Sequence, residues 1–392
     1  MKKLRIALPM FGLVLLAAAC NKKADFNYYY YEPEDYALLS QYLNLPETPH
    51  DYRAELPKHI SSLGLSVRQV DQDKAILGRV LFYDTKLSKD GTISCASCHK
   101  QELAFADNAK VSTGVFGRAG DRNSIALGSV LNFSAYYGTD VFGSAGIPFF
   151  WDNRAGTATA QNIASMTNPK EMDMSHGDIV AAVQAQPYYE PLFRMAFNSS
   201  QVTSDRVSEA IAEFVNAIGS YKSKFDKEAE KEIGYQVYYN SEYKDFANFT
   251  AQENRGKKIY LDNCASCHSP TQSRPAKLQA NNGLDATTTD EGVGGITKSS
   301  QDMGMFKVPL LRNIALTAPY MHDGRFQTLE EVVEHYSTGV QNHPNLSEEL
   351  RSFNGAKNLN LSAEDKQALI AFLNTFTDQQ MQADVRFSNP FK

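Results

Sequence analysis

One pentapeptide, Cys-Ala-Ser-Cys-His, occurs twice in this chain of 392 residues, at 95–99 and at 264–268. Two cysteines separated by two residues and followed by histidine form the attachment pattern of a c-type haem: the thiols bind the vinyl groups and the histidine ligates the iron. A zinc site and a thioredoxin-like dithiol also use closely spaced cysteines. Zinc does not require histidine after both second cysteines, and a redox dithiol needs only one pair. The repeat therefore predicts two covalently bound c-type haems, held by Cys95, Cys98, His99, Cys264, Cys267 and His268.

The remaining cysteine, Cys20, lies near the start of the chain and ends a different pattern. Three basic residues open the chain, an apolar run too short to span a bilayer follows, and three alanines precede Cys20. This pattern is typical of a bacterial lipoprotein signal peptide at residues 1–19, with cleavage before Cys20 and a lipid on its sulfur. An ordinary signal peptide with an incidental cysteine is the alternative. Both export the protein, so we expect it on the periplasmic side of the cell envelope, with the lipid anchor as its only contact with the membrane.

The charge balance narrows the classes of partner. There are 45 acidic and 39 basic residues, which gives a net charge of -6. An acidic balance argues against nucleic acid as a ligand and mildly favours a basic partner protein. The length suits two domains.

Helical patterns lead into both pentapeptides. Apolar residues recur at helical spacing over 67–82, before the first one. Thr250 and Glu253 form a capping box for a helix that runs directly into the second one. Ser362 with Asp365 caps a further helix that carries an apolar stripe. Long alternating strand patterns are scarce, so the sequence predicts a mostly α protein with two cytochrome c-like haem domains.

The chain divides accordingly into four parts. Residues 27–57 are rich in tyrosine, proline and acidic residues and have no clear periodicity, which indicates a spacer or a wrapping segment. We place the join between the halves in the charged stretch 222–232. The predicted parts are a signal peptide at 1–19, a tether or N-terminal extension at 20–60, the first haem domain at 61–228 and the second haem domain at 229–392.

Six segments, in order between residues 63 and 378, carry a family resemblance, and the first of them includes the first pentapeptide. They are SCASCHKQELAFAD, STGVFGRAGDRN, FFWDNRA, NPKEM, FKVPLLRN and LTAPYMHDGRFQTLEEVVEHY. Together they resemble the bacterial di-haem cytochrome c peroxidase family, which includes the MauG-type enzymes. The resemblance implies that the haem of the N-terminal domain meets peroxide and that the haem of the C-terminal domain supplies or stores electrons.

The resemblance also implies roles for three residues after the first pentapeptide. Trp151, the only tryptophan, matches the family tryptophan that stands between the two haems. Gln161 and Glu171 follow at ten-residue steps and match the glutamine and glutamate beside the open haem. Splitting peroxide needs a base that takes a proton from one oxygen and returns it to the other, and Glu171 is our candidate for that base.

Two positions depart from ordinary peroxidases of this family. Val115 stands where many members carry a distal histidine, so the first haem should have an open coordination position. Tyr336 stands where they carry an axial methionine, which is the MauG pattern, and a phenolate should lower the reduction potential of the second haem. Because helix phase decides which side chain faces the haem, other ligands stay open: His335, His343, Met303, Met305 and Met321.

The resemblance further implies a calcium ion, held through Asn123, Thr317 and Pro319, since an oxygen-only shell suits a hard cation. The chain between Asn123 and Trp151 is longer than the family pattern, with an aromatic- and glycine-rich insertion at 134–150. This insertion could shape the peroxide pocket or cover an approach used by a redox partner.

The leading hypothesis is a di-haem c-type peroxidase that reduces hydrogen peroxide to water. Its electrons would come from a small redox protein, a cytochrome c or a cupredoxin-like donor, and a homodimer is compatible with the resemblance. The first alternative is a MauG-like oxidase that modifies a protein or a small molecule. The second is a di-haem electron carrier without catalysis, against which Glu171 and Val115 argue.

Overall fold

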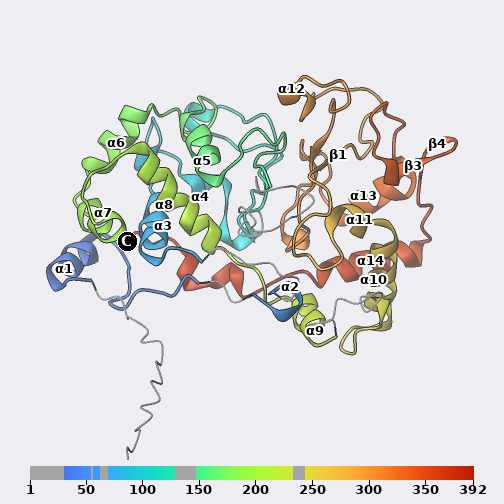
Figure 1. Cartoon of the computed structure of the whole chain (residues 1–392), viewed down its shortest axis with the longest axis horizontal. Coiled ribbons are helices and arrows are strands. Elements are labelled where there is room, and N and C mark those ends of the chain that lie inside the picture. Colours follow the sequence, from blue (N-terminus) through green and yellow to red (C-terminus); the bar gives the residue numbers. More distant parts are fainter. Residues whose placement is uncertain (1–30, 54–55, 62–68, 129–146, 233–242) are drawn as a thin grey trace, which may run out of the picture.

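The computed structural model describes residues 31–53, 56–61, 69–128, 147–232 and 243–392. The predicted signal peptide, Cys20 and most of the 134–150 insertion lie outside these residues. Across the described ranges no helix is both long and apolar enough to cross a bilayer. Figure 1 shows two mostly helical bodies side by side, with α1 and α3–α8 in the first and α9–α14 in the second.

The predicted predominance of helix is confirmed, since the described strands are only two residues long. The helices are α1 (Pro33–Tyr42), α2 (Lys58–Ser61), α3 (Gln72–Tyr83), α4 (Cys95–Cys98), α5 (Ala158–Thr167), α6 (His176–Gln184), α7 (Tyr189–Phe197), α8 (Ser204–Ala217), α9 (Lys224–Glu232), α10 (Ala251–Asn263), α11 (Ala265–His268), α12 (Gly294–Thr297), α13 (Leu329–Glu334) and α14 (Ala363–Asn374). The strands pair antiparallel, β1 (Gln279–Ala280) with β2 (Phe306–Lys307) and β3 (Arg351–Ser352) with β4 (Gly355–Ala356).

Each body is built around one pair of helices that approach closely through a glycine. In the first body α3 packs against α8, and a Cβ added to Gly78 would stand 1.9 Å from the carbonyl oxygen of Ala210. In the second body α10 packs against α14, and a Cβ on Gly256 would stand 1.8 Å from the carbonyl oxygen of Ala368. Only glycine permits these approaches. The repeated pentapeptides therefore belong to a repeated structural unit, as two cytochrome c-like domains require.

The predicted helix starts are confirmed where the structure describes them. At the start of α10 the Thr250 hydroxyl accepts from the Glu253 N–H at 3.1 Å, and the Glu253 carboxylate accepts from the Thr250 N–H at 2.6 Å. At the start of α14 the Ser362 hydroxyl accepts from the Asp365 N–H. These bonds satisfy amide groups that the first turn of a helix leaves without partners. The second pentapeptide follows the end of α10 directly.

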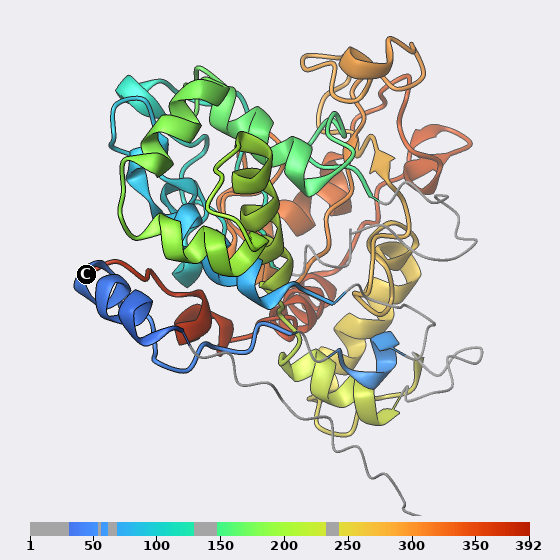
Figure 2. The ribbon, with the colours of Figure 1, turned by 60° about the vertical axis from the view of Figure 1, so that its left-hand side comes forward.

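Both ends of the described chain complete the first core. Leu39, Leu43 and Tyr52, which precede α2, are buried there, so this part of the predicted tether wraps the first body. From the other end, Met381 and Phe387 enter the same core. Figures 1 and 2 show this C-terminal tail running back from α14 to α1. The predicted boundaries after residues 60 and 228 stay predictions, and the structure adds that the last residues of the C-terminal part pack on the N-terminal one.

A buried ion pair lies in the stretch that we expected to join the halves. Asp226 of α9 accepts two hydrogen bonds from Arg312 Nη1, at 2.8 and 2.9 Å, and one from the Ser223 hydroxyl at 2.7 Å. The Nε2 atom of His59, on α2, lies 3.4 Å from the same carboxylate. Burial opposes ionisation, but Arg312 and the neighbouring hydrogen bonds lower the pKa of Asp226 to about 2. The N-terminal segment, the junction and the second body therefore meet at one charged carboxylate.

Candidate functional site

The first pentapeptide borders a cavity of about 510 Å³. The single turn of α4 carries Cys95 and Cys98, and His99 follows at its end. His99 Nδ1 lies 3.0 Å from the carbonyl oxygen of Phe105, to which it donates as the protonated ring nitrogen. This bond fixes the tautomer and leaves Nε2 with a lone pair for a metal.

The second pentapeptide borders a separate cavity of about 220 Å³. Cys264, Cys267 and His268 line it, and His268 Nδ1 lies 2.9 Å from the carbonyl oxygen of Pro309. The two histidines are thus held in the same way, each by a backbone oxygen.

Both cavities fit a c-type haem. The four thiols are not joined in disulfides, and burial raises the pKa of Cys95 and of Cys264 to about 12, which keeps these two thiols neutral. Burial lowers the pKa of His99 and of His268, so each imidazole keeps the neutral form that ligates iron. In the described part of the chain no three or more His, Cys, Asp or Glu side chains converge as a zinc site would require. The residues present would therefore hold one haem in each cavity.

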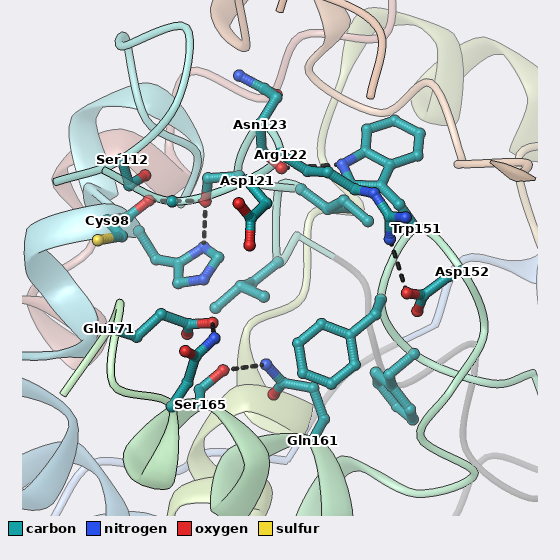
Figure 3. A pocket seen from close by; sticks show the side chains of 18 of the residues that line it. Cys98, Ser112, Asp121, Arg122, Asn123, Trp151, Asp152, Gln161, Ser165 and Glu171 are labelled. Atoms are coloured by element: carbon teal, nitrogen blue, oxygen red, sulfur yellow. Dashed lines mark hydrogen bonds and ion pairs between the residues drawn. The ribbon is translucent and has the colours of Figure 1, made fainter. Parts of the chain in front are cut away.

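The predicted proton-transfer residue lines the first cavity together with Gln161. Glu171 lies in the loop after α5, and the Asn168 side chain donates to its carboxylate at 2.8 Å. Burial raises the pKa of Glu171, while hydrogen bonds from Ser165 and Asn168 and the charge of Arg154 act in the opposite direction. Figure 3 shows Gln161, Ser165 and Glu171 along one side of the cavity. A carboxyl group whose pKa is raised is suited both to accept a proton and to return it.

Val115 is fully buried, and its side chain is not part of the described cavity lining. Its backbone N–H donates to the carbonyl oxygen of Glu171 at 2.9 Å. Among the described residues that line the first cavity, His99 is the only histidine, and there is no methionine. The geometry is thus compatible with the open coordination position that we predicted.

Trp151 lines both cavities, in agreement with its predicted place between them. Its indole Nε1–H donates to the carbonyl oxygen of Asn123 at 2.8 Å, and its own carbonyl oxygen accepts from the Lys307 N–H at 2.7 Å. Asn123 and Lys307 also line both cavities. These bonds fix the indole in the wall that the two cavities share.

Two basic residues of the first cavity, Arg122 and Lys307, were missed by sequence reasoning. Arg122 pairs with Asp152, the neighbour of Trp151, at 2.7 Å and with Asp290 of the second body at 2.7 Å. Lys307 is buried, and this burial lowers its pKa to about 7. Both lie in segments that carry the family resemblance, but nothing in their spacing along the sequence indicates a place beside Trp151.

Tyr336 lines the second cavity, together with His268. It lies on a π-helical turn, His335–Gly339, that continues α13. Asn282 Nδ2 lies 3.4 Å from both the Tyr336 hydroxyl and the Met321 sulfur. Burial raises the pKa of Tyr336 to about 12.

The alternatives to Tyr336 divide into two groups. Met321 also lines the second cavity. The other four alternatives are not among the described residues that line this cavity. His335 contacts the carbonyl oxygen of Asn282, and His343 contacts the Thr288 hydroxyl group. Met303 and Met305 are the remaining two. The choice between the predicted ligands therefore narrows to Tyr336 and Met321.

The three residues predicted to hold calcium, Asn123, Thr317 and Pro319, all line the second cavity. The Asn123 side-chain nitrogen donates to the carbonyl oxygens of Ala109 and Lys110, at 3.2 and 3.3 Å. This arrangement leaves its side-chain oxygen as the donor atom that a hard cation such as calcium would prefer.

Comparisons with known proteins agree with this geometry. The profile of the family described as di-haem cytochrome c peroxidase matches residues 72–233, and that of cytochrome c matches residues 253–377. The chain is 32% identical to the cytochrome c551 peroxidase of Nitrosomonas europaea, over 80% of this chain and 83% of that protein. It is 34% identical to the methylamine utilization protein MauG of Methylorubrum extorquens, over 77% of this chain and 78% of that protein.

A solved structure shares the whole arrangement. The crystal structure of a MauG-like protein associated with microbial copper homeostasis superposes with a TM-score of 0.67 and 30% identity, over 87% of this chain and 98% of that one. The two cytochrome c-like domains, each with its own cysteine–histidine cavity, are those of a protein that carries two c-type haems. With relatives this similar over most of both chains, the protein belongs to the di-haem cytochrome c peroxidase family.

Proposed function

We propose that this protein reduces hydrogen peroxide to water. The observation that carries the proposal is the first cavity, where Gln161 and Glu171 share a space with His99 and where the described lining holds no second histidine or methionine. An electron carrier usually fills both axial positions of its haem and has no need of a buried carboxyl group there. The named peroxidases among the relatives support the same assignment.

Three residues of this chain would have separate roles in the reaction. Bound haem supplies the iron at which two electrons and two protons convert one hydrogen peroxide to two waters. Glu171 takes the proton of the nearer peroxide oxygen and returns it to the oxygen that leaves as water. The Gln161 amide orients peroxide through hydrogen bonds. The hydrogen bonds of Trp151 hold its indole between the cavities, where it can carry electrons from the second haem to the first.

The test is Glu171→Gln, which keeps the size and hydrogen bonds of the side chain but removes the base. Peroxide turnover with a small chemical electron donor should fall by roughly 10²- to 10⁴-fold, the usual contribution of a positioned acid–base group. Glu190→Gln is the matched control, since Glu190 lies exposed on α7 in an ion pair with Arg194. Wild-type turnover in Glu171→Gln, or negligible turnover by the wild type, would refute the proposal.

A second candidate function, MauG-like oxidation of a protein or small molecule, is favoured by Tyr336 in the second cavity. The two functions differ in what happens without an electron donor. A peroxidase stops consuming peroxide when its own electrons are spent, whereas an oxidase continues in the presence of its substrate and leaves an oxidised product that mass spectrometry detects.

Beyond the two haems, we propose a calcium ion, a protein that donates electrons and a lipid anchor. Calcium bound through Asn123, Thr317 and Pro319 would tie the first body to the second, and its removal by a chelator should lower peroxide turnover reversibly.

We infer that a cytochrome c or a cupredoxin-like protein delivers electrons at the second haem, and a homodimer is compatible with this use. The pattern that ends at Cys20 supports a lipid anchor on the periplasmic side of the envelope.

A further inference from the structure

The first cavity contains a hydroxyl group to which no role has been assigned. Ser165 lies on α5, one turn after Gln161, and both residues line the cavity. Gln161 Nε2 donates to Ser165 Oγ at 3.0 Å. Figure 3 shows this bond, with the Glu171 carboxyl on the other side of Ser165.

The bond decides how Gln161 can act. An amide side chain offers one donor and one acceptor group, and rotation by half a turn exchanges them. Because one of its two N–H groups donates to Ser165, Gln161 offers a ligand its second N–H and its side-chain oxygen. A hydroxyl group that accepts from Gln161 still has its own proton to donate.

Glu171 lines the same cavity, and the Ser165 side chain favours its ionised form, as the bond from Asn168 does. From other elements, the positive charge of Arg154 acts in the same direction and the negative charge of Asp121 opposes it. Among the residues described around Glu171, Ser165 alone also binds Gln161.

We propose that Ser165 is a positioning residue of the peroxide pocket, whose hydroxyl joins Gln161 to Glu171 and holds both side chains in their working orientation. The inference rests on the proposed function and deepens it. Ser165 need not touch peroxide. It receives the Gln161 N–H, directs its own O–H to the Glu171 carboxylate and so couples the two groups that act on peroxide.

The experiment compares Ser165→Ala with Ser165→Thr in the haem-loaded protein. The alanine variant loses the hydroxyl, so peroxide turnover at neutral pH should fall by about tenfold, as expected for one lost hydrogen bond to a charged group. Without this donor the Glu171 carboxylate is harder to ionise, so the acidic limb of the pH profile should move to higher pH. The threonine variant keeps the hydroxyl and should keep most of the activity and the wild-type pH profile.

Infrared difference spectroscopy gives a second measurement that does not depend on turnover. The carbonyl stretch of protonated Glu171, identified by its absence in Glu171→Gln, should titrate at higher pH in Ser165→Ala than in the wild type. Thr167→Val is the matched control, because the Thr167 hydroxyl donates to Ile163 of its own helix, outside the described cavity lining.

Each outcome decides one claim. An unchanged carboxyl titration in Ser165→Ala, or an equal shift in Thr167→Val, would overturn the role of Ser165. If the wild type lacked peroxide turnover, the proposed function would fall, but the infrared titration would still show whether Ser165 acts on Glu171.

Discussion

Tyr336 and Met321 offer the second cavity two different donor atoms within reach of one amide group. Asn282 contacts both side chains, and its backbone oxygen accepts a hydrogen bond from His335 Nε2 at 3.0 Å. The contacts of Asn282 thus hold two residues of the π-helical turn. A π turn shifts the phase of a helix locally, and such turns are frequent at functional sites. Within this turn both His335 and Tyr336 contact Asn282, the first through Nε2 and the second through its hydroxyl group.

The identity of the axial ligand can be tested at this residue. If Tyr336 ligates the second haem, Tyr336→Met should raise the reduction potential of that haem by a substantial part of the roughly 0.8 V range that axial ligands span. A redox titration followed by visible spectroscopy measures the shift. Met321→Leu is the comparison: if it changed the spectrum while Tyr336→Phe left it unchanged, Met321 would be the ligand.

At the scale of elements, each haem domain depends on one helix pair that meets at a glycine. In Gly256→Ala, the helix gains up to about 1 kcal/mol of intrinsic propensity. The new Cβ would, however, overlap the Ala368 carbonyl oxygen at 1.8 Å, and overpacking of this kind costs typically about 1–3 kcal/mol. The overlap should win, because backbone atoms cannot move aside as a side chain can.

We therefore expect Gly256→Ala to lower the denaturant midpoint of unfolding. The effect should be stronger for the second haem domain than for the first, as reported by the absorbance of each haem. Gly156→Ala is the control, since a Cβ there meets nothing within 4 Å. Equal midpoints for the two variants would show that α10 and α14 can separate without cost.

The sequence predicted those elements that carry strong local signals. The N-caps of α10 and α14 and the apolar periodicity of α3 and α14 are local. The pentapeptides identify the haem sites because their spacing contains the chemistry. Helix α1 was not predicted, because it is short and has a single fully buried residue, Leu39. The Ser165 and Asn282 contacts could not be predicted either, since they depend on tertiary placement. Serine in a helix and asparagine in a loop are ordinary.

At the scale of the whole molecule, the Asp226–Arg312 pair lies where the N-terminal segment and the junction meet the second body. Removing one partner of a buried ion pair leaves an uncompensated charge and costs about 3–5 kcal/mol. Asp226→Asn should therefore lower the thermal midpoint near neutral pH, as measured by calorimetry. Asp245→Asn is the control, because its ion pair with Lys258 is exposed and such pairs contribute little.

The same pair should also add an acid-sensitive component to stability. The folded pKa of Asp226 is about 2, below the unfolded value of about 3.9. Its stabilisation is therefore complete above that unfolded value and is lost as pH falls towards 2. The gap in thermal midpoint between the wild type and Asp226→Asn should narrow over this range. A gap that stayed constant would show that Asp226 is not the titrating group.

The return of the C-terminal tail to the first core has a consequence for biogenesis. Synthesis proceeds from the N-terminus, and domains usually fold in that order as they emerge. Here the first haem domain lacks Met381 and Phe387 until the final residues of the chain are made. That core is therefore complete only after the second haem domain has been translated. The turn that carries Cys95 and Cys98 therefore belongs to a domain that is made first and completed last.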